Sequence, residues 1–506
     1  MNASDDGYGV TTGYTYGYYR RLSPSWLRLM ATIHSVPFPE GEPFRYFELG
    51  YGQGVSLNVH AATNPGEYWG TDYNPEHVEF ARQMAQASGA PVHLLDLSFE
   101  ELAERDDLPQ FQVIVAHGIW SWISDSSRAA VLRFVDKHLV PGGLLYLSYN
   151  ALPGAASGIA VQRLIRTLTQ SMDPALSERE RFEQACEHLR TIEGAANSHF
   201  ANYSKARERL DRILNAKSTY VLHEYTVDAW EPMLLTDVAA ALRPIGLEFI
   251  GTAELDSRMA WQVTDNGHSD DLGPASNQTT LGSVMLREAL RDFEFDRQFR
   301  NDLFVRGSAR AGPEASKRLL MEQSFALTRH PDAVGIVADD ASDETDAALC
   351  RAVLSEFLNR PDGIAAVDTI SDSLHGATPS RILRSILLSA GVGALHPVGE
   401  DIDEAEIKRA RALNGFLMMD QPANSKINIA ASPLVGAGVR CFGPAPISGV
   451  TLANDPDHLD QLSKNSIEGR QCREGVNFTA LALLKMSAIY SAQRAILENL
   501  KIETKI

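Results

Sequence analysis

Short apolar segments alternate with amphipathic segments between residues 44 and 150. The strand-like segments read RYFELG, YWGTD, VHLLD, FQVIVAHG and GGLLYLSYN, and helical segments begin near Val55, Pro75, Ser98 and Ser127. Strands separated by helices form right-handed βαβ units around a mainly parallel sheet. The pattern therefore predicts an α/β doubly wound domain. A Tyr/Gly-rich arm at 8–19 and a helix opened by Ser23-Pro24 precede it.

The next part of the chain has a different periodicity. Residues 156–216 carry apolar positions at helical spacing, and 218–255 predicts a strand, a helix containing Asp237 to Leu242, and another strand. The polar tract 264–279 predicts a loop, and the following LREALRDFEFDRQFRNDLFVR predicts a helix that leads into a strand. We therefore place a helical and α+β middle domain at 156–307, after a first domain at 1–155.

A third, α+β region is predicted at 308–506. The acidic residues 339–344 stand before AALCRAVLSEFL, where the helix dipole favours them. Thr378-Pro379 opens a helix that Gly391 ends, and the strand-like GALHPV follows. This helix, helix, strand order permits a winged-helix-like module.

Composition and charge narrow the class of protein. The chain has 506 residues, 44% of them hydrophobic, and its formal net charge is −19. Such a charge repels a phosphate backbone, so we expect no nucleic-acid partner, whereas a basic protein or peptide substrate would be attracted. Without a signal peptide or a long apolar stretch, we expect a cytoplasmic protein with no membrane insertion. The four cysteines lack metal-ligand spacing, so we expect buried thiols and no metal: Cys186, Cys350, Cys441 and Cys472.

The sharpest local motif follows the first strand. Phe47-Glu48-Leu49 is followed by Gly50, Gly52 and Gly54, which places a carboxylate at a strand end before three glycines at two-residue spacing. Glycine permits both a tight turn and a close approach of the backbone to a ligand. Alternatively, the motif could be a tight turn that binds no ligand.

Carboxylates also end the next two strands. Asp72 follows the second strand, where it could accept both hydroxyls of a ribose or cap the helix before Pro75. Asp96, followed by Leu97, ends the third strand, where it could bind an adenine amino group or cap the helix near Ser98. The carboxyl ends of parallel strands meet at one edge of a sheet, so the three acids are expected to converge.

The glycine spacing separates two nucleotide cofactors. The nicotinamide fingerprint G-x-G-x-x-G needs a glycine where Val55 stands. The E-x-G-x-G-x-G form, with the second-strand acid and the Asp-Leu pair, resembles the class I S-adenosylmethionine methyltransferases over about residues 44–150. By that resemblance, Glu48, Gly50, Gly52 and Gly54 would hold the methionine moiety of S-adenosyl-L-methionine, Asp72 the ribose, Asp96 and Leu97 the adenine, and His117 would lie near the transferred methyl.

Further segments narrow the resemblance. They read AHGIWSWI (116–123), VPGG (140–143), LSYNALPG (147–154), YTYGYY (14–19) and HEY (223–225). Together they resemble a bacterial family that joins a class I domain to a methyltransferase regulatory domain, over roughly residues 10–310. Members of that family include rickettsial lysine methyltransferases that act on outer-membrane proteins. The resemblance implies the reaction type more strongly than the methyl acceptor.

We expect N-methylation of protein lysine side chains. A lysine must lose its proton before attack, and an aromatic wall would assist by desolvating the ammonium. The candidate acceptor residues are Trp120, Trp122, Tyr149, Asn150 and Tyr16. If the acceptor is instead a hydroxyl of a small molecule or a surface glycan, His117 could be the base. A non-catalytic regulator that senses the cofactor is a third option. The accessory regions would bind substrate or form a homodimer.

Overall fold

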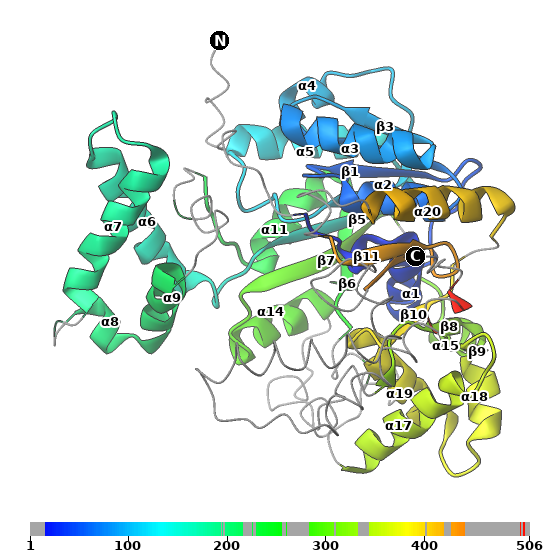
Figure 1. Cartoon of the computed structure of the whole chain (residues 1–506). Helices are drawn as coiled ribbons and strands as arrows, with labels where there is room; N and C mark the ends of the chain where they lie inside the picture. Colours follow the sequence, from blue (N-terminus) through cyan, green and yellow to red (C-terminus); the bar gives the residue numbers. More distant parts are fainter. Residues whose placement is uncertain are drawn as a thin grey trace, which may run out of the picture.

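The structure is a computed structural model (Figure 1), and the residues it describes are 16–193, 195, 198–215, 225, 229–255, 260, 283–307, 310–331, 344–399, 402–418, 427–440, 496, 499 and 500. Several predictions fall outside these residues. They are the strand expected from 218 with His223 and Glu224, the polar tract 264–279, the acidic residues 339–343, and Cys441 and Cys472. Cys186 and Cys350 are buried free thiols, as expected.

A seven-stranded sheet in the order β3-β2-β1-β4-β5-β7-β6 forms the centre of the molecule. Its first five strands are parallel, whereas β7 runs antiparallel to both β5 and β6. The doubly wound α/β prediction is confirmed. The strands are β1 (Arg45–Leu49), β2 (Glu67–Thr71), β3 (Val92–Leu95), β4 (Phe111–Ala116), β5 (Leu139–Asn150), β6 (Leu247–Thr252) and β7 (Phe299–Arg306).

Helices cover both faces of this sheet. One face packs against α1 (Pro24–Ile33), α2 (Val55–Thr63) and α3 (Pro75–Ser88), with Trp26 and Tyr46 fully buried between them. The other face packs against α4 (Phe99–Ala103), α5 (Asp125–His138), α11 (Leu235–Leu242) and α14 (Val284–Glu294), around Phe47 and Phe134. Ser23 caps α1 as the Ser-Pro pair predicted, whereas α5 begins two residues before the predicted Ser127 because Ser124 caps it.

The sheet extends past the predicted domain boundary at residue 155. Strands β7 and β6 come from the segment predicted as a middle domain, and β7 pairs with β5 along its length from Leu144 to Asn150. A short 3₁₀ helix, η2 (Arg243–Ile245), joins α11 to β6. The middle segment thus supplies two strands and two covering helices to the doubly wound layer.

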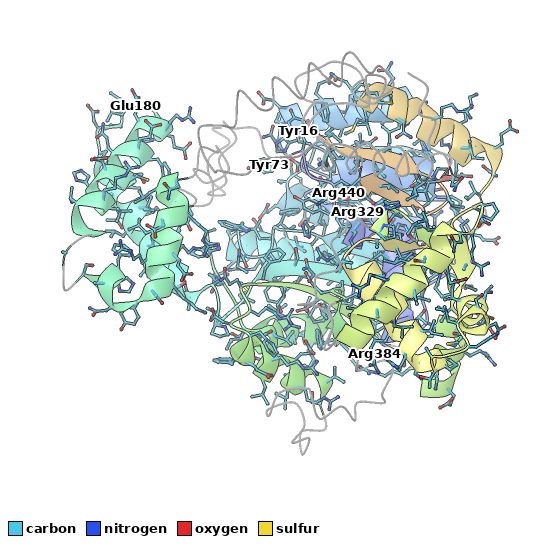
Figure 2. The ribbon with its side chains drawn as sticks, turned by 60° about the horizontal axis from the view of Figure 1, so that its bottom comes forward. Tyr16, Tyr73, Glu180, Arg329, Arg384 and Arg440 are labelled. Carbon is cyan, nitrogen blue, oxygen red and sulfur yellow. The ribbon has the colours of Figure 1, made fainter. Side chains whose placement is uncertain are left out.

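Among the described residues between β5 and α11, four helices form a separate group. They are α6 (Ala156–Ser171), α7 (Glu178–Glu193), α8 (His199–Asn202) and α9 (Ser204–Asn215). Figures 1 and 2 show this group standing beside the main body, with Glu180 on its far part. It has its own core, which includes Ile165, Leu189 and Phe200. The helical character expected for 156–216 is confirmed over these bounds.

The C-terminal region packs beside the central sheet. A three-stranded antiparallel sheet in the order β10-β8-β9 carries the helices of this region. The two helices and the strand predicted for a winged-helix-like module are α17, α19 and β10, but β9 and α18 lie between the two helices, and the central strand β8 comes from upstream. The elements are α15 (Pro313–Glu322), β8 (Ser324–Leu327), α17 (Glu344–Leu358), β9 (Ile364–Ala366), α18 (Val367–Ser373), α19 (Pro379–Gly391) and β10 (Leu395–Pro397).

The last described elements return to the first domain. Helix α20 (Glu404–Leu417) packs on α2 and α3, and a hairpin of β11 (Ile429–Ser432) and β12 (Ala437–Arg440) joins the same core. Phe80 and Phe416 meet in that core with ring centroids 6.3 Å apart. Within the described residues, none of the helices is both long and apolar enough to span a bilayer.

Candidate functional site

The glycine loop after β1 turns sharply into α2. Gly50, Gly52 and Gly54 all have left-handed backbone angles, with φ of 64°, 56° and 70°. A Cβ on Gly54 would lie 2.6 Å from the Cβ of Ala81, and one on Gly50 would lie 2.8 Å from Cγ2 of Ile119. Glycine is therefore required here by both conformation and space.

Asp72 turns back toward this loop. Its Oδ2 accepts a hydrogen bond of 2.8 Å from the backbone N–H of Gly52, and its Oδ1 accepts one of 3.0 Å from that of Asn74. His77 Nδ1 lies 3.1 Å from the same Oδ1. The cap of α3 is Asn74, so the interpretation of Asp72 as that cap is wrong. Asp72 instead joins the tip of β2 to the glycine loop.

Three carboxylates lie around Tyr51. The Tyr51 hydroxyl donates to the carbonyl of Leu95 at the end of β3. Burial raises the pKa of Tyr51, and the negative charges of Asp72, Asp96 and Glu48 raise it further against the opposing charge of Arg82. Asp96 itself is exposed, and Ser98 rather than Asp96 caps α4. The Thr71 hydroxyl donates 2.7 Å to the carbonyl of Leu97, which ties the second strand to the third.

Glu48 is a buried acid at the tip of β1. Only 4% of it is exposed, and burial, with the neighbouring charge of Asp72, raises its pKa from 4.5 to about 8. Its Oε2 has no hydrogen-bond partner among the described residues. A buried carboxylate oxygen without a partner is costly, which suits a position that a cationic ligand completes.

His117 directly follows β4 and belongs to a polar group with Tyr146 and Ser148 of β5. Its Nδ1 lies 2.9 Å from the Tyr146 hydroxyl and 3.0 Å from Oγ of Ser148. The ring of Tyr19 covers it, with centroids 4.1 Å apart. Burial, and then the positive charge of Arg21, lower the pKa of His117 to about 3. His117 is therefore neutral at physiological pH.

Four of the five predicted acceptor residues lie on the loop after β4 and on β5. Trp122 stacks on Trp230 at 5.7 Å, and the indole N–H of Trp230 donates 3.0 Å to Oδ1 of Asn150. Trp120 is 2% exposed, and its indole nitrogen has no partner within the described part of the chain. Trp122 and Asn150 thus lie together, whereas Trp120 is a core residue.

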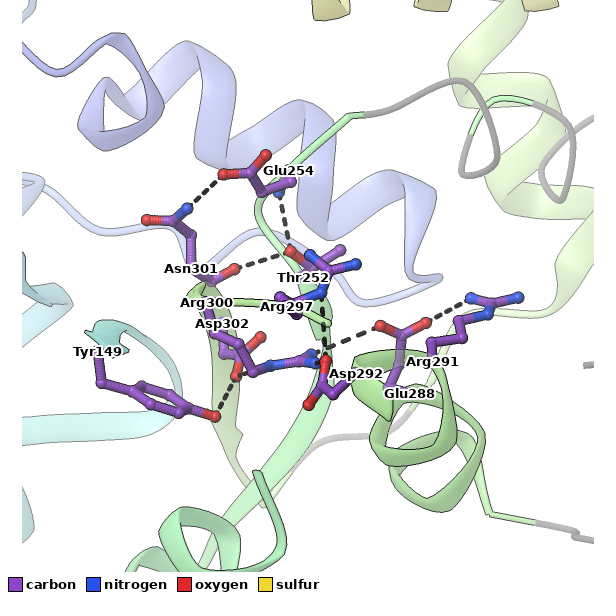
Figure 3. A network of polar contacts seen from close by, with 10 residues as sticks. All are labelled: Tyr149, Thr252, Glu254, Glu288, Arg291, Asp292, Arg297, Arg300, Asn301 and Asp302. Atoms are coloured by element: carbon purple, nitrogen blue, oxygen red, sulfur yellow. Dashed lines mark hydrogen bonds and ion pairs between the residues drawn. The ribbon is translucent and has the colours of Figure 1, made fainter. Parts of the chain in front are cut away.

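Tyr149 belongs to a buried charge cluster. Its hydroxyl donates 2.7 Å to Oδ2 of Asp302, which also accepts from Nε of Arg300 at 2.7 Å. Arg300, fully buried, reaches Asp292 and Glu288 on α14 as well (Figure 3). The Tyr149 ring therefore packs on the α14 face of the sheet, opposite the face of His117.

Tyr16, the fifth predicted acceptor residue, lies on the N-terminal arm. Its ring contacts Phe80 of α3 edge-on, with centroids 5.1 Å apart, and Figure 2 places it on the main body. Further along the arm, the hydroxyl of Tyr18 accepts a 2.7 Å bond from the N–H of Gly438, and the N–H of Tyr19 donates 2.9 Å to Oγ of Ser56. The arm continues through η1 (Arg20–Leu22). It therefore links α2, α3 and the C-terminal hairpin.

Several residues near His117 were not predicted. Tyr146 and Ser148 contact it directly, Tyr19 covers its ring, and Glu254 and Asn301 come from the end of β6 and from β7. A usable signal was present in RNDLFVR, where three polar residues interrupt an otherwise apolar strand. Their partners lie far away in the sequence, so the pattern alone could not show which site they join.

Comparison with known proteins identifies the family of this chain. Residues 47–143 match the family described as "Methyltransferase domain", and residues 217–306 match "Predicted methyltransferase regulatory domain". An uncharacterized protein of Synechocystis sp. is 32% identical over 445 residues, which cover 86% of this chain and 85% of that protein. The chain belongs to the class I S-adenosylmethionine methyltransferases that carry a methyltransferase regulatory domain.

Two further proteins are similar to part or all of the chain. An uncharacterized protein of Rickettsia prowazekii is 26% identical over 204 residues, or 40% of this methyltransferase and 80% of the relative. The fold is similar to that of PKMT2 from Rickettsia typhi in complex with AdoHcy. That likeness has a TM-score of 0.64 at 17% identity and covers 97% of this chain and 100% of that one. As a member of that family, the methyltransferase uses S-adenosylmethionine as its cofactor. The match at 217–306 contains β6 and β7, so the regulatory domain completes the catalytic sheet.

Proposed function

We propose that this methyltransferase methylates the side-chain nitrogen of lysine in protein substrates. The observation that carries the proposal is the neutral His117, whose pKa lies near 3. A hydroxyl acceptor must give its proton to a base during attack, and so weak a base is ill suited to that at pH 7. A deprotonated amine is nucleophilic by itself, so an amine acceptor fits this site better than a hydroxyl of a small molecule or glycan.

The residues around the glycine loop fit the cofactor. We assign Glu48, with its unpartnered buried oxygen, to the ammonium of the methionine moiety, and the backbone of Gly50, Gly52 and Gly54 to close contact with that moiety. Asp72 would hold the ribose, and Asp96 and Leu97 the adenine. S-adenosylmethionine supplies an electrophilic methyl group on its sulfonium. The protein itself binds the cofactor, orients the acceptor and excludes water.

The surroundings of His117 favour the uncharged form of a lysine. The ring of Tyr19 and the burial of His117 make the site poorly solvated, and Arg21 adds a positive charge. A lysine ammonium, with an ordinary pKa of about 10.4, would be repelled by that charge and would lose solvation. Both effects promote release of its proton before attack. Trp120, Trp122, Tyr149, Asn150 and Tyr16 remain predicted acceptor residues.

Two further features support a protein as the substrate. The similar fold of a rickettsial protein named PKMT2 extends over nearly the whole chain, including the accessory regions. The net charge of −19 would attract a lysine-rich segment. A cytoplasmic location and a homodimer belong to the same proposal. Light scattering after size exclusion tests the homodimer, which would have twice the 55.5 kDa mass of the chain.

Radiolabelled S-adenosylmethionine and a bacterial lysate test the proposal. The wild-type protein should transfer label to protein, and acid hydrolysis should recover it as methylated lysine. Asp72→Ala, which removes the carboxylate that meets the glycine loop, serves as the inactive control. Label found only in small molecules or in glycan would contradict the lysine proposal. Tight cofactor binding without turnover would contradict an enzymatic role.

A further inference from the structure

A continuous chain of hydrogen bonds runs from His117 to the end of β6. His117 Nδ1 lies 2.9 Å from the Tyr146 hydroxyl, and that hydroxyl lies 2.6 Å from Oδ1 of Asn301. Asn301 Nδ2 in turn donates to Oε1 of Glu254, as Figure 3 shows. Tyr146 and Asn301 are 0% and 2% exposed. The chain crosses from β4 through β5 and β7, and half of its members come from the regulatory domain.

The chemistry of these groups fixes the direction of every proton. A carboxylate only accepts, so the Asn301 amide must turn its N–H toward Glu254 and its oxygen toward Tyr146. Tyr146 must then donate its single proton to that oxygen. Its remaining lone pairs face Nδ1 of His117, and two lone pairs at 2.9 Å would repel each other. Nδ1 therefore carries the proton and donates it to Tyr146.

Ser148 is compatible with the same arrangement. Its Oγ accepts a 2.7 Å bond from the N–H of Gly118 and lies 3.0 Å from Nδ1 of His117. With Nδ1 protonated, this oxygen is a second acceptor for the same proton. A proton on Nδ1 of neutral imidazole leaves Nε2 with a free lone pair. No partner of Nε2 occurs among the described residues.

We propose that Glu254, Asn301 and Tyr146 are positioning residues that hold His117 as its Nδ1–H tautomer, so that Nε2 accepts a hydrogen bond from the nitrogen that receives the methyl group. This proposal rests on the proposed function for the identity of that nitrogen. An N–H of the neutral amine would donate to Nε2, which orients the amine lone pair for in-line attack. The regulatory domain thereby takes part in substrate alignment.

Two contacts hold Glu254, the last residue of the hydrogen-bond chain, in place. Glu254 is 3.4 Å from a terminal nitrogen of Arg21, which helps to keep it an ionised acceptor. Its backbone N–H donates 3.1 Å to the Thr252 hydroxyl, whose proton goes to the carbonyl of Asn301. Glu254 is thus held on both its side chain and its backbone. Replacing Asn301 would break the hydrogen-bond chain in its middle and leave the contacts of His117 with Tyr146 and of Glu254 with Arg21 in place.

Histidine ¹⁵N spectra of the full-length protein would test the tautomer. The His117 signals are assigned by their loss in His117→Asn. Wild type is expected to show Nδ1 protonated and Nε2 unprotonated. In Asn301→Leu the Tyr146 proton has lost its acceptor and would turn to Nδ1, so the spectrum should change to the Nε2–H form. Asn301→Asp keeps an acceptor oxygen toward Tyr146 and should keep the wild-type tautomer.

Turnover gives a second measurement. Asn301→Leu should lower kcat roughly tenfold or more, as expected for the loss of a buried hydrogen bond that acts in the transition state, while cofactor affinity stays unchanged. Asn301→Asp should recover most of that loss. If Asn301→Leu does not fold, Tyr146→Phe breaks the same chain. Tyr46→Phe is the matched control, because it removes a buried hydroxyl on the same face that donates to Leu22 instead.

The outcomes separate this proposal from the proposed function. A wild-type His117 with its proton on Nε2, or a tautomer unchanged in both Asn301→Leu and Tyr146→Phe, would overturn the positioning role even if lysine is methylated. Conversely, an acceptor other than lysine would refute the proposed function, while the tautomer spectra would still report on the hydrogen-bond chain. Equal loss of kcat in Tyr46→Phe and Tyr146→Phe would also count against the positioning role.

Discussion

Replacing Glu48 by glutamine should make the unliganded protein more stable at high pH. Burial and the charge of Asp72 raise the folded-state pKa of Glu48 from 4.5 to about 8. Between these two pH values the folded protein holds a proton that the unfolded chain has released. Stability therefore falls as pH rises through this window, and does not fall further above it.

The magnitude follows from the width of the window. One full pH unit inside the window corresponds to about 1.4 kcal/mol, and this slope falls to half at the folded-state pKa of about 8, so wild type should lose about 2 kcal/mol relative to Glu48→Gln between pH 6 and pH 8. Glutamine keeps the shape and leaves a similar unpartnered polar group, so that cost cancels between the two proteins. Bound S-adenosylhomocysteine, which carries the same ammonium, should remove the difference by pairing with the ionised carboxylate of wild type.

Urea unfolding at pH 6, 7 and 8 measures this difference. Tryptophan fluorescence reports on the relevant core, because Trp26 and Trp120 are buried in it. Glu79→Gln is the control, since Glu79 is exposed on α3 and its loss should not alter the pH dependence. Parallel stability curves for wild type and Glu48→Gln across the three pH values would refute the reasoning.

Three further substitutions test the ribose contact, the glycine loop and the buried charge cluster around Arg300. Asp72→Ala should weaken cofactor binding by roughly 10- to 100-fold in calorimetry, and unchanged affinity would remove Asp72 from the ribose. Gly54→Ala should cost more stability than Gly89→Ala, because both have positive φ but only Gly54 lacks room for a Cβ; equal thermal shifts would contradict this. Arg300→Met should lower the free energy of unfolding by about 3–5 kcal/mol, since it strands buried carboxylates such as Asp302. A loss below about 1 kcal/mol by urea titration would show that the cluster relaxes.

The first five strands and their helices could be predicted because their signals are local. Gly54 and Asn74 cap the helices that follow β1 and β2 within a few residues of those strands, Ser23 caps α1 ahead of β1, and apolar runs mark each strand. The glycine loop and the acids at the strand tips follow from the same order, since parallel strands bring their carboxyl ends together.

The remaining parts depend on contacts between distant residues. Tyr149 remains a predicted acceptor residue, and its hydroxyl meets Asp302, 153 residues further along the chain. Nothing near Tyr149 in the sequence specifies that partner. Likewise the pairing of β7 with β5 decides which side chains reach His117, and neither strand encodes it by itself. Local periodicity predicts elements well and their neighbours poorly.

The position of β7 limits what its domain can regulate by moving. A chain cut after residue 155 would leave the buried edge of β5 with a row of unpaired N–H and C=O groups from Leu144 to Asn150. Such an apolar open edge tends to recruit other strands and aggregate. Release of this domain would therefore disrupt the central sheet and would not reversibly inhibit the enzyme. Any regulation through this domain has to act by small shifts within an intact sheet.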